Sequence, residues 1–206
     1  MFAATRLVPV VVLDDAAHAA PLGDALAAGG LACAEITFRT SAAAAAIEVL
    51  AQRPGFLVGA GTVVTIAQAD QAITAGARFV VSPGLDPAIV THCQERSIPV
   101  LPGIATASEL QAAMRLGLDA VKFFPAEAMG GAKTVKALTG PFPAMRFVPT
   151  GGITPDNLAG YLTQRNVLAV GGSWMVTPDL IRAKNFATIA EDTRRAVELA
   201  ATHRND

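Results

Sequence analysis

Short apolar runs rich in strand-forming residues alternate with longer stretches of helical pattern along the whole chain. This alternation predicts an α/β protein in which each strand is followed by a helix. The predicted strands occupy residues 7–13, 32–38, 56–60, 79–82, 99–101, 120–124, 146–150 and 168–170, and the predicted helices occupy residues 16–28, 42–52, 66–75, 88–96, 107–116, 132–138, 155–162 and 187–202.

Several of the predicted helices end at a glycine. Gly29 and Gly30 follow the first helix, Gly76 follows the third and Gly117 follows the fifth. Glycine readily adopts the left-handed backbone conformation that often terminates a helix. These positions therefore support the predicted helix boundaries.

Eight strand–helix units fit the length of a small (β/α)8 barrel, or TIM barrel, since 206 residues leave about 26 for each unit. A doubly wound sheet fits the alternation nearly as well, because the pattern does not show whether a sheet closes on itself. The count of eight favours the barrel, as does the absence of a Gly-x-Gly-x-x-Gly turn after the first strand. No linker or charge block divides the chain, so we expect a single domain over residues 1–206.

The composition argues against several classes of function. Hydrophobic residues make up 52% of the chain and the net charge is −1, which offers no broad field for nucleic acid or an anionic membrane. No segment has the length of a secretory signal or a membrane span. Cys33 and Cys93 lie in apolar segments without metal-ligand spacing, so we expect reduced thiols in a cytoplasmic protein.

The second predicted strand carries three polar side chains on one face. Strand side chains alternate, so Glu35, Thr37 and Arg39 point one way, while Ile36 and Phe38 point toward the helices. In a barrel the polar face is the interior, where a charge costs several kcal/mol unless it is paired or contacts a ligand. Two interpretations stay open, a structural ion pair between Glu35 and Arg39 and a ligand-binding site.

A single lysine lies within an apolar strand. Lys122 shares its strand face with Phe124, whereas Lys133, Lys136 and Lys184 lie in segments that are predicted to be solvated. Burial favours the neutral amine of a lysine, which is the form that attacks a ketone. A lysine that merely extends its ammonium to the surface is the alternative. The charges expected on the second strand favour the reactive lysine.

Two glycine turns follow the seventh and eighth predicted strands. The first contains Thr150, Gly151 and Gly152, and the second contains Gly172 and Ser173. Glycines let backbone N–H groups approach an anion closely, and loops at these two positions of a barrel are a recurrent phosphate site. One such turn would be weak evidence, but the two together predict phosphate binding.

The segment VGAGTV at 58–63 resembles a dinucleotide-binding loop but lacks its third glycine. We interpret it as a close-packed strand end that presents the Thr62 hydroxyl at the mouth of the barrel. The three histidines share no common face, so we expect neither a metal nor any other cofactor.

Seven motifs, in this order and spacing, are similar to those of the 2-keto-3-deoxy-6-phosphogluconate (KDPG) and 4-hydroxy-2-oxoglutarate (KHG) aldolases. The resemblance implies a (β/α)8 barrel, class I aldolase activity without a metal, a phosphorylated keto acid substrate, pyruvate as a product and assembly as a homotrimer. The motifs are EITFRT at 35–40, VGAGTV at 58–63, SPG at 82–84, PGIATASEL at 102–110, VKFFPAE at 121–127, PTGGI at 149–153 and VGGSWMV at 170–176.

The resemblance also implies a role for each matching residue. Lys122 would form the Schiff base and Glu35 would act as the general acid and base. Arg39 and Thr62 would hold the carboxylate and neighbouring oxygens of the pyruvate moiety, and Phe124 would line the pocket. The residues implied to bind the phosphate are Thr150, Gly151, Gly152, Gly172 and Ser173.

Two features depart from the family pattern. Phe38 stands where leucine is usual, but it is expected to face the helices, so the chemistry should not change. The chain also begins almost directly at the first strand, whereas many relatives begin with a helix that covers the bottom of the barrel. How this end is sealed is therefore open.

Three other assignments are compatible with parts of the pattern. A sugar-phosphate epimerase or synthase would share the glycine turns but would not need Lys122 beside Glu35. A sugar-phosphate-binding protein without activity would not need the full set of polar residues. Within the aldolase assignment, the galactonate epimer of KDPG and KHG are alternative substrates.

Overall fold

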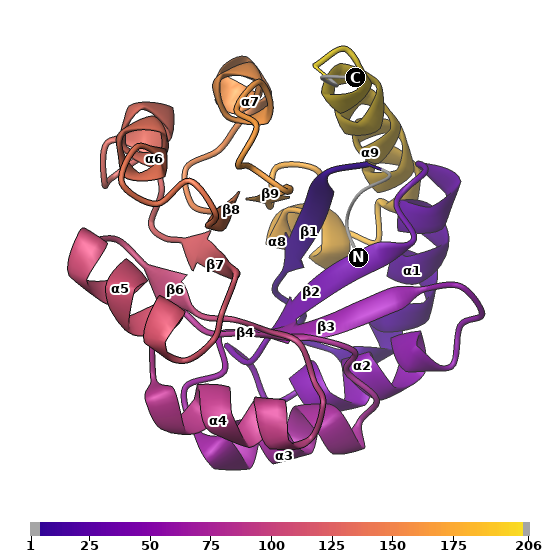
Figure 1. Ribbon diagram of the computed structural model, residues 1–206. Coiled ribbons are helices and arrows are strands. Elements are labelled where there is room, and N and C mark those ends of the chain that lie inside the picture. The colour runs from indigo at the N-terminus through magenta and orange to yellow at the C-terminus, as the bar shows by residue number, and fades with distance from the viewer. Residues whose placement is uncertain (1–4, 204–206) are drawn as a thin grey trace.

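The computed structural model describes residues 5–203, in which short parallel strands lie inside a layer of helices (Figure 1). The strands are β1 (Leu7–Val11), β2 (Cys33–Thr37), β3 (Leu57–Gly61), β4 (Val80–Val81), β5 (Val100–Leu101), β6 (Gly103–Ile104), β7 (Ala120–Phe123), β8 (Arg146–Pro149) and β9 (Val170–Gly172). The helices are the 3-10 turn η1 (Ala16–His18) and α1 (Ala19–Ala28), α2 (Ala43–Ala51), α3 (Ile66–Thr74), α4 (Pro87–Glu95), α5 (Ala107–Arg115), α6 (Gly131–Thr139), α7 (Pro155–Leu162), α8 (Pro178–Arg182) and α9 (Phe186–Ala201).

The elements follow the predicted order, with three differences. The fifth predicted strand corresponds to β5, but the chain continues beyond it, past Pro102, into the additional short strand β6, and the eighth begins two residues later than predicted, as β9. Helix α8 is an additional turn before α9 that the periodicity did not indicate. The prediction that glycines terminate these helices is confirmed, since Gly30, Gly76 and Gly117 all have positive φ.

All strand pairs are parallel, and the strands form a curled α/β arrangement. One sheet has the order β5-β4-β3-β2-β1-β9 and a second has the order β6-β7-β8. The last strand therefore lies beside the first, with Leu7 opposite Val170. This order contains no reversal of the kind that a doubly wound sheet has at its switch point.

The two sheets meet at both of their edges. At one edge β5 runs through Pro102 into β6, and the Lys122 N–H donates to the Pro102 carbonyl at 2.9 Å. At the other edge Phe147 bridges to Val167 and Thr150 bridges to Gly171. Because all these strands are parallel, the carboxyl ends of β2, β3, β7, β8 and β9 lie on the same side of the structure.

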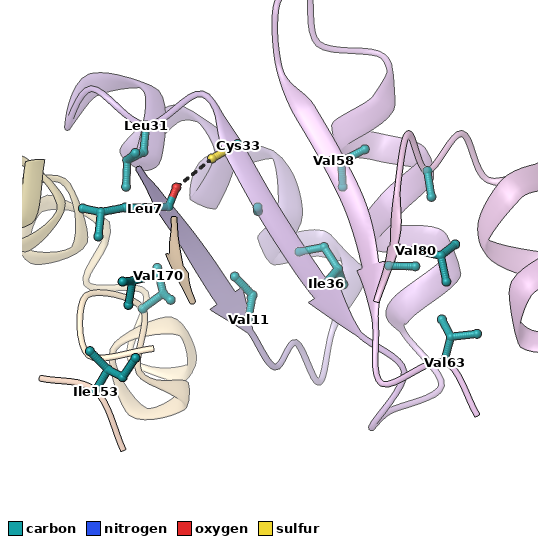
Figure 2. Packing of buried hydrophobic residues seen from close by; sticks show 14 of the residues in the cluster. Leu7, Val11, Leu31, Cys33, Ile36, Val58, Val63, Val80, Ile153 and Val170 are labelled. Carbon is teal, nitrogen blue, oxygen red and sulfur yellow. Dashed lines mark hydrogen bonds between the residues drawn. The ribbon is translucent and has the colours of Figure 1, made fainter. Parts of the chain in front are cut away.

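Apolar side chains on the outer face of the strands pack beneath the helices. Figure 2 shows this cluster, in which Leu7 and Val11 of β1, Ile36 of β2 and Val58 of β3 contribute to one continuous core. Leu7, Ile36 and Val58 are completely buried. Fully burying such a side chain stabilises a fold by roughly 1.5–3 kcal/mol, so this layer fixes the strands that carry the polar residues.

Both cysteines are free and buried, as predicted. The Cys33 thiol donates to the Leu7 carbonyl (Figure 2). Burial raises the pKa of Cys33 to about 12 and also raises that of Cys93. A thiol with a raised pKa remains protonated at neutral pH and is a poor nucleophile, so these cysteines are core residues.

A second apolar cluster lies on the opposite, inner face of the strands. It consists of Val8, Phe79, Val81 and Ala169, all buried. Beyond it, the amino ends of the strands surround a cavity of about 660 Å³. The inner cluster therefore separates this cavity from the polar groups at the carboxyl ends.

None of the helices in residues 5–203 combines the length and the apolar character that crossing a membrane requires.

Candidate active site

Lys122 and Glu35 form a buried ion pair on the inner side of the curled sheets. The Lys122 Nζ atom lies 3.2 Å from Glu35 Oε1, and the two side chains are only 7% and 4% exposed. They come from β7 and β2, 87 residues apart in the sequence. Removing both charges from water costs several kcal/mol for each ion, which a close hydrogen-bonded pair offsets in part. Such a pair is unusual in an otherwise apolar interior, which makes it the candidate for the active site.

The register of the strands brings the two side chains together. Glu35 lies opposite Gly59 in β3 and Val10 in β1, in the middle of the longest stretch of pairing. Lys122 lies opposite Gly103 on one side and Val148 on the other. Both residues thus sit on hydrogen-bonded strands rather than on loops, which holds their side chains in place.

Gly61 leaves the space that the Glu35 carboxylate occupies. A Cβ atom at this position would overlap Glu35 Oε1, the same oxygen that contacts Lys122. The backbone at Gly61 is ordinary extended strand, so the requirement for glycine is a matter of space. Sequence reasoning missed this role, although the glycine lies in the VGAGTV segment.

The side chains around the pair come from the carboxyl ends of neighbouring strands. The Phe124 ring centroid lies 5.1 Å from Lys122 Nζ. Thr62 follows β3 and has a φ of +56°, a left-handed conformation that costs a non-glycine residue roughly 1–2 kcal/mol. Thr62 and Phe124 each follow directly on the carboxyl end of a strand, β3 and β7, so both lie at the same end of the molecule as the pair.

Arg39 lies differently from the prediction. Strand β2 ends at Thr37, so the alternation of faces does not continue to Arg39, which is exposed in the following turn. Glu35 forms its ion pair with Lys122 and not with Arg39. The Thr37 hydroxyl is engaged as well, since it donates to the Val11 carbonyl at 2.8 Å. The structural Glu35–Arg39 pair is thus not formed.

The glycine turn after β8 presents unused backbone donors. Gly151 and Gly152 both have positive φ, at 102° and 76°. The Gly151 N–H faces Gly171 across the bridge between Thr150 and Gly171, whereas the N–H groups of Gly152 and Ile153 have no backbone acceptor within residues 5–203. Unpaired backbone donors in successive residues form a concave site that suits an anion. Thr150, which precedes them, is buried.

The second glycine turn lies beside the first. Thr150 packs directly against Gly171, where a Cβ atom would overlap its Oγ1. The Trp174 ring lies on Gly172 in the same way, so Trp174 is a packing residue, as predicted. Ser173, which lies between Gly172 and Trp174 in the chain, is exposed. The structure thus brings the two turns together, as the barrel positions predicted.

The other three lysines are exposed, as predicted from their segments; they are Lys133, Lys136 and Lys184. Within the described range 5–203, no three His, Cys, Asp or Glu side chains are grouped as metal ligands would be.

The sequence model of the family described as KDPG and KHG aldolase matches residues 1–191. This chain belongs to that family. A curated relative from Treponema pallidum, a 2-dehydro-3-deoxy-phosphogluconate aldolase, is 48% identical over 94% of this chain and 93% of its own length. The KHG/KDPG aldolase of Escherichia coli K12 is 46% identical, with coverage of 93% and 91%.

Solved structures of family members have the same fold. The KDPG aldolase of Legionella pneumophila, with pyruvate captured at low pH as a covalent carbinolamine intermediate, is 42% identical and superimposes with a TM-score of 0.91 over 95% of each chain. The enzyme of Zymomonas mobilis ZM4, with 3-phosphoglycerate, is 41% identical with a TM-score of 0.88, and the match covers 95% of this chain and 92% of that one. The family to which this chain belongs is therefore one of carbon–carbon lyases.

We predict that Gly61→Ala displaces the Glu35 carboxylate from Lys122 and lowers kcat for aldol cleavage by on the order of 10²-fold, the lower end of what a positioned acid–base group contributes. The measurement is steady-state cleavage, with folding checked by circular dichroism. Gly84→Ala is the matched control, because a Cβ atom there meets nothing within 4 Å. A folded Gly61→Ala enzyme with the kcat of the wild type would show that Glu35 is not needed where the structure places it.

Proposed function

We propose that this protein is a class I aldolase that cleaves KDPG to pyruvate and glyceraldehyde 3-phosphate, with Lys122 as the Schiff-base lysine. The buried contact between Lys122 Nζ and Glu35 Oε1, 3.2 Å long, carries this proposal. An epimerase or synthase that works without a covalent lysine has no need for that pair. A catalytically silent binding protein would not retain a charge pair that is costly to bury.

The first step requires a neutral amine on Lys122. The proton of the ammonium passes to Glu35 along their hydrogen bond, which leaves two neutral groups in the desolvated interior. The Lys122 nitrogen then attacks the C2 ketone carbon to give a carbinolamine. Glu35 returns its proton to the departing hydroxyl group, which leaves as water and gives an iminium ion. This cation can accept the electron pair of the bond that breaks next.

Glu35, once ionised, removes the proton of the C4 hydroxyl, directly or through one water molecule. The C3–C4 bond breaks, its electrons form an enamine on Lys122, and glyceraldehyde 3-phosphate departs as the aldehyde. Protonation of the enamine at C3, for which Glu35 again holds the proton, and hydrolysis of the imine release pyruvate. One carboxylate thus serves as base and acid in turn.

The residues around the pair would bind the carboxylate and the phosphate of the substrate. Arg39 and Thr62 would hold the carboxylate and adjacent oxygens, and the Phe124 ring would wall the pocket beside the imine. The phosphate would lie on Thr150, Gly151, Gly152, Gly172 and Ser173. The N–H groups of Gly152 and Ile153 support this placement, because they supply donors without a side-chain cation.

The same proposal includes the architecture and the cellular context. Pairing of the first with the last strand supports one closed (β/α)8 barrel and one domain over residues 1–206. The two buried thiols are consistent with a reducing, cytoplasmic environment. Assembly as a homotrimer is the family expectation, and exposed apolar side chains such as Val64 and Ile66 are compatible with it.

The test is a side-by-side assay of kcat/KM on KDPG, its galactonate epimer and KHG. We expect KDPG to be cleaved most efficiently. The relative from Escherichia coli is called a KHG/KDPG aldolase, so measurable cleavage of KHG is expected too. A preference for the epimer or for KHG would change the substrate assignment, and an enzyme that cleaves none of the three would refute the proposed function.

We predict that Gly152→Val lowers kcat/KM for KDPG far more than for KHG, which has no phosphate. The added side chain would block the anion and crowd Glu127, whose Cβ and Cγ atoms lie 2.7 and 2.9 Å from a Cβ atom at Gly152. Part of the loss should appear in kcat, because binding energy from the phosphate can be used in the transition state.

The control for this prediction is Gly55→Val. Gly55 has nearly the same φ, 74°, and open space around it, so the variant carries the backbone strain without the block. An unchanged ratio of the two specificity constants in Gly152→Val would mean that the phosphate binds elsewhere.

A further inference from the structure

The segment that follows β7 donates hydrogen bonds to carbonyl groups of the glycine turn after β8. The Ala126 N–H donates to the Thr150 carbonyl at 2.8 Å, and the Glu127 N–H donates to the Gly151 carbonyl at 3.1 Å. Residues 126 and 127 come shortly after Lys122 in the chain. The loop that leaves the lysine strand is thus hydrogen-bonded to the turn proposed to bind phosphate.

The next carbonyl of the turn is held as well. The Asn157 side-chain amide donates to the Gly152 carbonyl at 3.1 Å, and Asn157 in turn accepts from the Thr154 N–H at 2.9 Å. Asn157 lies in the first turn of α7. Three successive carbonyls, those of residues 150, 151 and 152, are therefore engaged by the protein.

Holding these carbonyls fixes where the N–H groups point. In a planar trans peptide, the carbonyl of one residue and the N–H of the next point in opposite directions. The N–H groups of Gly151, Gly152 and Ile153 accordingly point away from residues 126, 127 and 157. The Gly151 N–H faces Gly171 across the bridge to β9, and in the described part of the chain the N–H groups of Gly152 and Ile153 have no backbone acceptor.

The side chain of Glu127 secures this arrangement. Its Cβ and Cγ atoms pack on Gly152, within 2.9 Å of where a Cβ atom would be. Its Oε1 atom accepts a hydrogen bond from the Tyr161 hydroxyl. The two groups meet over Gly131, from whose ideal Cβ position they lie 3.0 and 3.4 Å. Glu127 thus contacts the turn through its stem and α7 through its carboxylate.

Tyr161 is fixed in position by the core in which it is buried. It is completely buried on α7, the helix that starts directly after the glycine turn. Burial and the neighbouring carboxylate raise its pKa, so the hydroxyl stays protonated and remains a donor at neutral pH.

We propose that Glu127 and Tyr161 are positioning residues, whose hydrogen bond holds the loop after the lysine strand against the glycine turn and so aims the turn's N–H groups at the substrate phosphate. The inference rests on the proposed function, because it assumes that the phosphate binds at this turn. Neither side chain touches the reacting atoms. Their contribution should therefore depend on whether the substrate carries a phosphate.

The experiment compares cleavage of KDPG with cleavage of the same keto acid without its phosphate. Tyr161→Phe removes the hydroxyl and keeps the ring, and we expect a fall in kcat/KM for KDPG on the order of 10-fold, the scale of one hydrogen bond to a charged group. The phosphate-free substrate should change by less than about 2-fold. Glu127→Ala should behave like Tyr161→Phe.

Two variants serve as controls. Glu127→Gln keeps an oxygen that can accept from Tyr161, so it should retain most of the preference for KDPG over the phosphate-free acid. Thr139→Val removes a hydroxyl that donates to the Lys136 carbonyl at the far end of α6, and it should leave both substrates unaffected. The rate of borohydride trapping with pyruvate, which lacks a phosphate, should be the same in all variants.

Equal losses for both substrates in Tyr161→Phe, or no loss for either, would overturn the positioning role. A Glu127→Gln enzyme as impaired as Glu127→Ala would also overturn it, because the retained hydrogen bond would then have no effect. In these cases wild-type cleavage of KDPG and pyruvate trapping leave the proposed function standing. A wild-type enzyme that shows neither refutes the proposed function and the positioning role with it.

Discussion

The contact between the Lys122 ammonium and the Glu35 carboxylate is the constraint on which the rest of this structure depends. Two ionisable groups that are almost fully buried are tolerated only when they are close together and held rigidly. The protein meets this condition with regular strands on both sides and with Gly61, which makes room for the carboxylate. The apolar cluster beneath them, which includes Phe79 and Val81, excludes water from the other side. The two groups that the proposed reaction needs are therefore also groups whose burial lowers the stability of the fold.

The substrate proposed for this site has two ends, and the fold supports each end with a different kind of group. In this proposal, side chains on strands would act at the keto acid end, where a proton must move between defined atoms. Backbone N–H groups on glycine turns would act at the phosphate end, where only charge has to be stabilised. The loop from Phe124 to Glu127 connects the two ends, because it continues from the lysine strand and is hydrogen-bonded to the turn at Gly151.

Much of this arrangement could be predicted from the sequence, because strand alternation and the order of the elements determine which side chains face inward. The burial of Glu35 and Lys122 followed from their positions in apolar strands, and the proximity of the glycine turns followed from their places after the last two strands. The position of Arg39 was predicted wrongly, since alternation holds only while a strand continues and β2 ends at Thr37. The space at Gly61 depends on side chains that meet across strands, which no local pattern contains.

The formation of the imine on Lys122 is the central claim, and peptide mapping after reduction tests it most directly. The protein would be incubated with pyruvate, reduced with borohydride and digested, and the modified peptide would be identified by mass spectrometry, with Lys122→Arg as the control because a guanidinium cannot form the imine. We expect a single reduced adduct on Lys122 and none in the control. A label on Lys133, Lys136 or Lys184, or no label at all, would contradict the account.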